Sequence, residues 1–196
     1  MADTALPATT ALPLAALPRR RELLFGTAFT TSGVVMLMLT LVAAYLSARN
    51  AGGAQWLADN KIPLTQPNMM MLGLVMSVVT MQWAVYSVSN NDRVNTALAL
   101  GVSLLFGAAF LNQSVFLFTV AGVTLAQPEG KLFYAVTGAH MAMVIAAMVF
   151  VVFVAFRALG GQYSSRNPDG VSAAAVFWDA MVAVYAVVWV GVYVMK

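Results

Sequence analysis

The stretch FYAVTGAHMAMVIAAMVFVVFVAFRAL, residues 133–159, is apolar over a length that can cross a membrane as a helix. The hydrocarbon core of a bilayer is about 30 Å thick and needs about 20 helical residues. The stretch carries His140, the only histidine of the chain, and no charge before Arg157. An ionisable side chain within such a run is costly to bury, so His140 is a candidate for a polar contact with another helix.

Four further apolar runs surround this stretch, so the chain is predicted to be all-α, an integral membrane bundle of five transmembrane helices. The predicted spans are residues 24–47, 69–89, 97–126, 132–159 and 171–195. They form one membrane domain, residues 23–196, behind an Ala-, Pro- and Thr-rich tail, residues 1–22, that we predict to be disordered. The short segment 90–95 makes spans two and three antiparallel neighbours, and residues 128–131 separate spans three and four.

Five spans place the two termini on opposite sides of the membrane. The arginine cluster at residues 19–21 directly precedes the first span and favours an inner N-terminus and an outer C-terminus, with six basic residues inside and four outside. The expected location is a bacterial plasma membrane. Aromatic rings near the predicted span ends are expected at the membrane interface: Trp56, Trp83, Trp178, Tyr45, Tyr86 and Tyr134.

Composition restricts the chemistry of this chain. It is 61% hydrophobic and 9% charged, which leaves no room for a soluble catalytic domain, and it has no basic stripe for nucleic acid. Without cysteine it has no thiolate ligands, and with one histidine it is not expected to hold a haem or copper centre by itself. We therefore predict no catalytic and no metal-binding residues in this chain.

Within the spans the strongly polar side chains are few: Gln82, Asn112, Gln113, His140 and Asp179. An unpaired Asp179 would cost on the order of 2.5–3.5 kcal/mol in the membrane. We interpret it as a carboxyl that is hydrogen-bonded at a helix interface or faces another subunit. The alternative is a proton or cation site. A direct pair between His140 and Asp179 is not favoured, because the two residues are predicted at different depths.

His140 is interpreted as an imidazole bonded to a backbone carbonyl or a hydroxyl near the outer surface. Asn112, Gln113 and Ser114 are interpreted as hydrogen-bonding groups between helices, with a substrate contact in a pore as the alternative. The thirteen methionines are assigned to packing rather than to copper(I) binding. Gly101, Gly107 and Gly138 suit close helix approach.

Several segments, taken in order, resemble one known family. FYAVTGAHMAM resembles the FY-x-x-TG-x-H-x-x-H segment of subunit III of haem-copper (cytochrome c type) oxidases, through Phe133, Tyr134, Thr137, Gly138 and His140. AAYLSAR at 43–49, SVVTMQWAVYS at 77–87 and FLNQ at 110–113 are similar to earlier segments of that family. The C-terminal FWDAMVAVYAVVWVGVYVMK is similar to its last helix, and keeps Trp178 and Tyr193. The number and order of helices fit its short five-helix form.

The resemblance implies a subunit that binds no haem or copper, since those belong to a partner, and that packs on oxidase subunits I and II. It also implies bound phospholipid between spans two and three, and support of proton uptake by the catalytic subunit. This chain departs from the family at several acids and histidines: Gly33 and Val34 stand at the position of a glutamate, Asp179 replaces a histidine, and Val182 replaces an aspartate. With these groups replaced, the resemblance does not extend to a proton relay, and it leaves the packing role.

Other functions remain open from the sequence. One alternative is the homologous accessory subunit that is associated with nitric oxide reductases. A small proton-coupled transporter or channel would use Asp179, Gln113 and Asn112. An assembly or scaffold protein for another membrane complex is the third alternative.

Overall fold

The computed structural model describes residues 21–53, 56–57 and 62–195. Five long helices account for most of them: α1 (Glu22–Gly52), α2 (Thr65–Ser89), α3 (Arg93–Val120), α4 (Pro128–Leu159) and α5 (Asp169–Val188), the last continued by the π-helical turn η2 (Trp189–Val194). All five are long and apolar enough to cross a membrane. In the described part of the chain the predicted all-α bundle is confirmed, with five helices of the length and hydropathy that a membrane span needs. The predicted tail lies outside the described residues except for Arg21 and Glu22, and Glu22 already begins α1.

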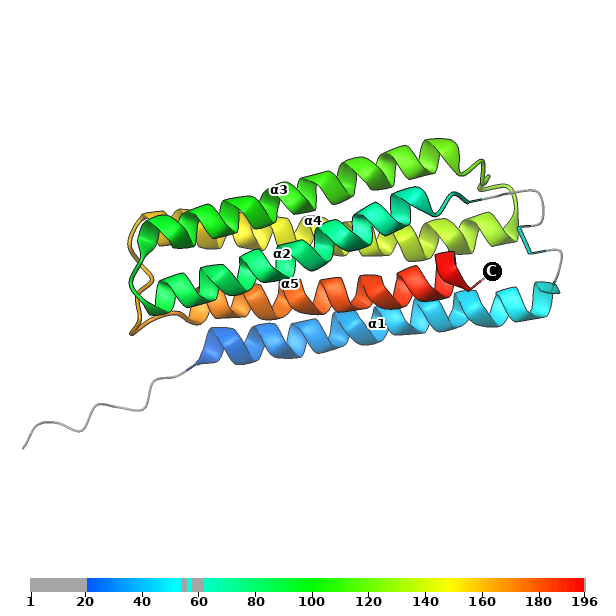
Figure 1. Ribbon diagram of the computed structural model, residues 1–196. Coiled ribbons are helices and arrows are strands. Elements are labelled where there is room, and N and C mark those ends of the chain that lie inside the picture. The colour runs from blue at the N-terminus through cyan, green and yellow to red at the C-terminus, as the bar shows by residue number, and fades with distance from the viewer. Residues whose placement is uncertain (1–20, 54–55, 58–61, 196) are drawn as a thin grey trace, which may run out of the picture.

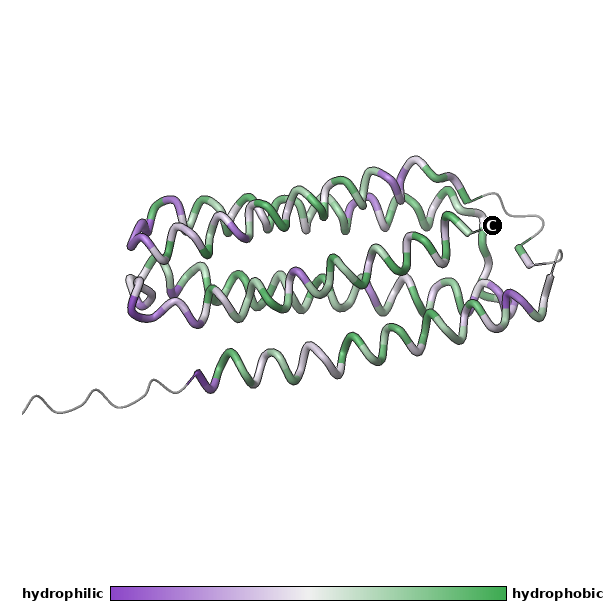
Figure 2. The backbone as a smooth tube through the Cα atoms, turned by 60° about the horizontal axis from the view of Figure 1, so that its bottom comes forward, coloured by the Kyte–Doolittle hydropathy of each residue, from purple (hydrophilic) through white to green (hydrophobic). Residues whose placement is uncertain are grey.

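The five helices run up and down along one common direction, and α5 occupies the centre of the bundle (Figure 1). It contacts α1, α2 and α4, while α3 packs on α2 and α4. In the most apolar 18-residue stretch of Asp169–Val194, half of the residues are buried inside the protein. In the corresponding stretch of α1, at the edge of the bundle, 22% are buried. Figure 2 shows hydrophobic residues along the helices and hydrophilic ones gathered at the two ends of the bundle, the pattern of a protein that faces hydrocarbon.

The turn between α2 and α3 is tight and makes these helices antiparallel neighbours, as predicted. Asn91 has a positive φ of 58°, a conformation that asparagine tolerates better than most residues. Asp92 caps α3, since its Oδ1 accepts a hydrogen bond from the backbone N–H of Asn95 at 3.0 Å. This cap begins α3 at Arg93, four residues before the predicted position.

The boundary between α3 and α4 differs from the prediction. α3 ends at Val120, six residues before the predicted end, and the chain then turns through Gly122, whose φ is 64°. Pro128 begins α4 instead of separating the spans, because a proline in the first helical turn loses no hydrogen bond. Gly130 is needed in this turn, since a Cβ there would collide with the carbonyl oxygen of Thr124.

Trp178 lies in the core of the bundle. Its side chain is fully buried, and its Nε1 donates a hydrogen bond to Ser77 Oγ of α2 at 2.8 Å. Gly107 of α3 makes room for the ring: a Cβ there would lie 3.0 Å from Trp178 Cη2. The predicted position of Trp178 at the membrane interface is therefore wrong, because a neighbouring helix supplies both the space and the polar partner.

Candidate functional site

The strongest polar contact between helices within the predicted membrane region joins α2 and α5. Gln82 Nε2 donates a hydrogen bond to Asp179 Oδ2 at 2.6 Å. Asp179 lies ten residues after Asp169, the first residue of α5, which places it about 15 Å along the helix. The prediction that Asp179 finds a hydrogen-bond donor is confirmed. Its Oδ1 is buried and makes no hydrogen bond among the described residues.

The Gln82–Asp179 pair lies at the surface of the bundle. Gln82 is exposed and Asp179 half-buried. On the same helix as Gln82, Trp83 is 40% exposed and Tyr86 is 70% exposed. On this side of the bundle α2 and α5 thus expose the polar pair, and the Trp83 and Tyr86 rings lie closer to the end of α2 at Ser89.

His140 is bonded within the bundle and does not pair with Asp179, as predicted. Its ring is 1% exposed, and Nε2 lies 3.1 Å from the backbone carbonyl oxygen of Met181 in α5. The interpretation of His140 as an imidazole bonded to a backbone carbonyl is confirmed. It does not lie near the end of its helix, since α4 begins at Pro128 and His140 comes twelve residues later.

Aromatic side chains enclose the His140 ring. The Phe110 ring of α3 meets it edge to face at a centroid distance of 5.4 Å, and the Tyr185 ring of α5 lies at 5.2 Å. The hydroxyl of Tyr185 donates to the backbone oxygen of Pro67 at 3.2 Å and so ties α5 to α2. Nδ1 of His140 is buried and makes no hydrogen bond in the described part of the chain.

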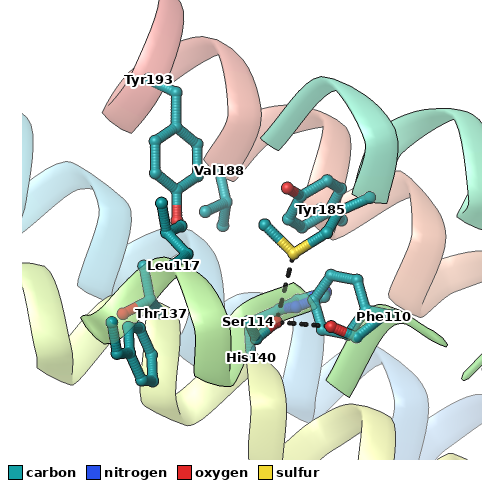
Figure 3. A pocket seen from close by; sticks show the side chains of 10 residues that line it. Phe110, Ser114, Leu117, Thr137, His140, Tyr185, Val188 and Tyr193 are labelled. Atoms are coloured by element: carbon teal, nitrogen blue, oxygen red, sulfur yellow. Dashed lines mark hydrogen bonds between the residues drawn. The ribbon is translucent and has the colours of Figure 1, made fainter. Parts of the chain in front are cut away.

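A small cavity lies beside this histidine (Figure 3). Its polar lining comes from Ser114 of α3, Thr137 and His140 of α4, Tyr185 of α5 and Tyr193 of η2. Sequence reasoning missed Tyr185 as a neighbour of His140. The available signal was the spacing of Trp178, Met181, Tyr185 and Val188, which places the four on one buried face of α5.

The structure brings only one of three adjacent polar residues on α3 into contact with another helix. Ser114 is buried, and its Oγ contacts Met70 Sδ of α2 at 3.2 Å and the carbonyl oxygen of Phe110 at 2.9 Å. Asn112 is exposed and Gln113 half-buried, and neither bonds to another helix among the described residues. The buried face of α3 repeats through Gly107, Phe110, Ser114 and Leu117, so Asn112 points to the opposite side.

The family-motif residues at the start of α4 build an aromatic cluster with the end of the chain. Phe133 is fully buried, and its ring lies 6.2 Å from that of Tyr193 and 5.3 Å from that of Tyr134. Tyr134 donates its hydroxyl hydrogen to the backbone oxygen of Val123 at 3.0 Å, and Thr137 bonds within its own helix. Gly138 faces open space, so close helix approach there is not the reason for glycine.

The resemblance implies phospholipid between α2 and α3, and these two helices are in direct contact. Thr80 Oγ1 of α2 and Ser103 Oγ of α3 lie 2.7 Å apart, in a direct hydrogen bond. Apolar surface grooves lie elsewhere. One of about 520 Å³ is formed by α1, α4 and α5 near Gly26 and Phe150, and one of about 620 Å³ runs along α3 near Gly101 and reaches Leu159 of α4.

No three His, Cys, Asp or Glu side chains gather where they could hold a metal ion, within residues 21–53, 56–57 and 62–195. The candidate site is thus a set of hydrogen bonds and ring contacts, with the Gln82–Asp179 pair on the surface and His140 inside. These contacts can join helices and present hydrogen-bonding atoms to a neighbouring chain.

Comparison with known proteins gives one family. A family model described as cytochrome c oxidase subunit III matches residues 20–196. Cytochrome c oxidase subunit 3 of Loxodonta africana is 29% identical over 132 residues, which cover 67% of this chain and 51% of the relative. The protein of the same name from Papio hamadryas is 26% identical over 145 residues, 72% of this chain and 56% of the relative. That from Spodoptera frugiperda is 25% identical, over 67% of this chain and 90% of the relative.

The chain spans about half the length of the first two of these relatives. The match of the family model nevertheless extends across all five membrane-length helices, including the FYAVTGAH segment of α4 and the FWDAM segment of α5. The five apolar helices and this match together indicate an integral membrane protein. The chain belongs to the cytochrome c oxidase subunit III family.

Proposed function

We propose that this chain is a non-catalytic, integral subunit III of a haem-copper terminal oxidase in a bacterial plasma membrane. It packs against oxidase subunits I and II, stabilises the catalytic subunit and supports its proton uptake. Haem and copper belong to the partner, and phospholipid is bound in the surface grooves of this chain. Its N-terminus lies inside and its C-terminus outside.

The observation that carries this proposal, beside the family, is the Gln82–Asp179 pair on the outer face of α2 and α5. Polar groups that face lipid at mid-membrane are costly, whereas the same groups at a contact with another helix are hydrogen-bonded. The exposed Trp83 and Tyr86 rings extend this face, and aromatic residues are enriched at protein interfaces. A second membrane subunit that covers the Gln82–Asp179 pair would shield these polar groups from lipid and so remove the free-energy cost of exposing them.

The test is to tag the C-terminus, extract the chain gently from native membranes and record the reduced-minus-oxidised spectrum of the material that co-purifies. Haem with oxygen-reducing activity supports the proposal. If the co-purified haem protein reduces nitric oxide instead, the chain is identified as the accessory subunit of a nitric oxide reductase. A colourless protein that purifies alone contradicts both.

The proposed contact face is tested in the same preparation. In a Gln82→Leu, Asp179→Leu double variant we expect the haem recovered per tagged chain to fall about tenfold, which corresponds to about 1.4 kcal/mol of lost association energy. Asn112→Leu is the matched control, since it removes an exposed polar side chain from α3 on another face of the bundle. Equal recovery from both variants would place the contact elsewhere.

A small proton-coupled transporter is the second candidate, because Asp179 Oδ1 is buried and makes no hydrogen bond among the described residues. A carboxyl of this kind can carry a proton. Transport by the purified chain in vesicles, abolished by Asp179→Asn, would favour this candidate over the oxidase subunit.

A further inference from the structure

The small cavity between α3, α4 and α5 is polar but uncharged. Ser114, Thr137, Tyr185 and Tyr193 contribute hydroxyl groups to its lining, and His140 contributes its imidazole. No carboxylate or basic side chain lines the cavity in the part of the chain that the structure describes. A protonated, cationic ring would lie here without a counter-charge, so the buried imidazole is neutral.

The single hydrogen bond of the ring fixes its tautomer. Nε2 of His140 lies 3.1 Å from the carbonyl oxygen of Met181, and a carbonyl only accepts hydrogen bonds. Nε2 therefore carries the hydrogen of the neutral ring. Nδ1 is left with a lone pair, and this buried acceptor has no hydrogen-bond partner among the described residues.

The neighbouring hydroxyl groups are directed to other acceptors. Thr137 Oγ1 donates to the carbonyl oxygen of Phe133 at 2.7 Å, and Tyr185 donates to that of Pro67 at 3.2 Å. Ser114 lies near the histidine in Figure 3, but its Oγ contacts the carbonyl oxygen of Phe110 and Met70 Sδ. No hydroxyl of the lining, that of Tyr193 included, makes a hydrogen bond to Nδ1 among the described residues, which leaves a molecule inside the cavity as the donor.

The size of the cavity selects that molecule. The centre of a water molecule can move within about 10 Å³ of it. One water needs about that much room and two to four polar partners. A cavity of this size matches a single water molecule.

We propose that one water molecule occupies this cavity and donates a hydrogen bond to Nδ1 of His140. Its remaining hydrogen and lone pairs meet the hydroxyl groups of the lining, which come from α3, α4, α5 and its continuation η2. Tyr193 directs its hydroxyl toward Leu117 at the wall of the cavity (Figure 3). The water thus joins three helices through the histidine of the FYAVTGAH segment. It gives Nδ1 of His140 a hydrogen-bond partner in a chain whose described residues form no cluster of metal ligands.

Solid-state NMR of the full-length chain, labelled with ¹⁵N-histidine and embedded in lipid bilayers, tests this site. His140 is the only histidine, so the spectrum reports the two ring nitrogens of one residue. We expect one protonated and one unprotonated nitrogen, with the unprotonated Nδ1 receiving magnetisation from exchangeable protons. That transfer should disappear in ²H₂O. An unprotonated nitrogen without transfer would mean a dry cavity and would overturn the proposal.

Three variants separate water from the hydroxyl groups. Ser114→Ala and Tyr193→Phe each remove one hydroxyl but keep the cavity open, so transfer to Nδ1 should persist. Loss of transfer in either variant would identify that hydroxyl as the donor and contradict the water site. Ser114→Val fills the cavity with methyl groups and should abolish the transfer while the Nε2 signal is kept.

A high-resolution map of the intact chain is the second measurement, and it does not depend on the folding of any variant. We expect a solvent peak within hydrogen-bond distance of His140 Nδ1. An empty cavity in a map that resolves other ordered solvent would contradict the proposal.

Discussion

Single buried side chains make several of the polar contacts that hold α5 in the bundle. Trp178 donates to Ser77, Tyr185 to the carbonyl oxygen of Pro67, and His140 of α4 contacts the carbonyl oxygen of Met181. Each contact joins a side chain to an uncharged partner, and none combines a nucleophile with a base. At this scale these contacts join helices.

From this packing role we predict that Asp179→Ala and His140→Ala leave turnover of the assembled oxidase, measured per haem, within a few-fold of the unmodified complex. The reason is that both side chains bond to groups of this chain, Asp179 to Gln82 and His140 to the carbonyl oxygen of Met181. Oxygen consumption of the purified complex is the measurement, and haem content reports assembly. A complete loss of turnover at normal haem content would show that one of these side chains has a catalytic or proton-transferring role.

At the scale of elements, the first turn of α3 depends on a charged cap. The backbone N–H and the side-chain amide of Asn95 both donate to Asp92, at 3.0 and 2.6 Å. These hydrogen bonds lower the pKa of the Asp92 carboxyl below its ordinary value. The carboxylate therefore stabilises the turn that makes α2 and α3 antiparallel neighbours.

The lowered pKa of Asp92 predicts a pH dependence of stability. Because the pKa is lower in the folded than in the unfolded chain, the contribution is present above the unfolded pKa of about 3.9 and is lost as the pH falls through the folded pKa. We expect Asp92→Ala to lower the thermal unfolding midpoint at pH 7, and the difference from the unmodified chain to shrink below about pH 4. Asp92→Ser keeps an uncharged cap and serves as the control. A difference that stays constant down to pH 3 would argue against the charge as its cause.

The glycines of α3 differ in what surrounds them. Gly107 is buried, and a Cβ there would meet Trp178 Cη2 and Met148 Sδ at 3.0 Å, whereas nothing lies within 4 Å of a Cβ at Gly101. Both glycines were predicted to allow close helix approach, and the structure assigns that role to Gly107 alone.

We predict opposite effects of alanine at these two positions. Gly107→Ala should destabilise the bundle by about 1–3 kcal/mol, because the rigid indole of Trp178 must shift. Gly101→Ala should stabilise it by up to about 1 kcal/mol, through the higher helix propensity of alanine. Unfolding in mixed micelles measures both. Equal effects would mean that α3 and α5 are less tightly packed than the structure indicates.

For the whole molecule, two loops meet at one end of the bundle. Asn91 of the α2–α3 turn and Ser165 of the α4–α5 loop exchange two hydrogen bonds, at 3.0 and 2.8 Å. The α3–α4 loop lies at the other end, beyond the membrane-length helices (Figure 1). This arrangement places residues 90–92 and 160–168 at one end of the bundle and residues 121–127 at the other.

Labelling of cysteines tests this arrangement, because the chain has no cysteine of its own. In intact cells we expect a membrane-impermeant maleimide to label Thr124→Cys and not Asn90→Cys or Ser165→Cys, as the proposed orientation requires. Permeabilised cells serve as the control, and there all three should react. The reverse pattern would invert the orientation and keep the fold, while equal labelling of Asn90→Cys and Thr124→Cys would contradict the arrangement of the loops.

The sequence by itself determined the number of helices, their order and the antiparallel pairing of α2 with α3. These depend on run length, on hydropathy and on the short turn at 90–92, all of which are local properties of the chain. It also indicated that Asp179 needs a donor and that His140 needs a carbonyl or hydroxyl, because the cost of a buried polar group is set by the membrane.

Only the tertiary structure decided which groups meet. The sequence offered several polar side chains as possible donors to Asp179, and only the packing of α2 on α5 shows that Gln82 is the one that bonds to it. Trp178 resembled an interfacial aromatic residue until Gly107 and Ser77, more than seventy positions away, supplied its space and its acceptor. The cavity beside His140 likewise depends on side chains from several helices. Such contacts follow from how helices pack, and no local pattern of residues specifies that packing.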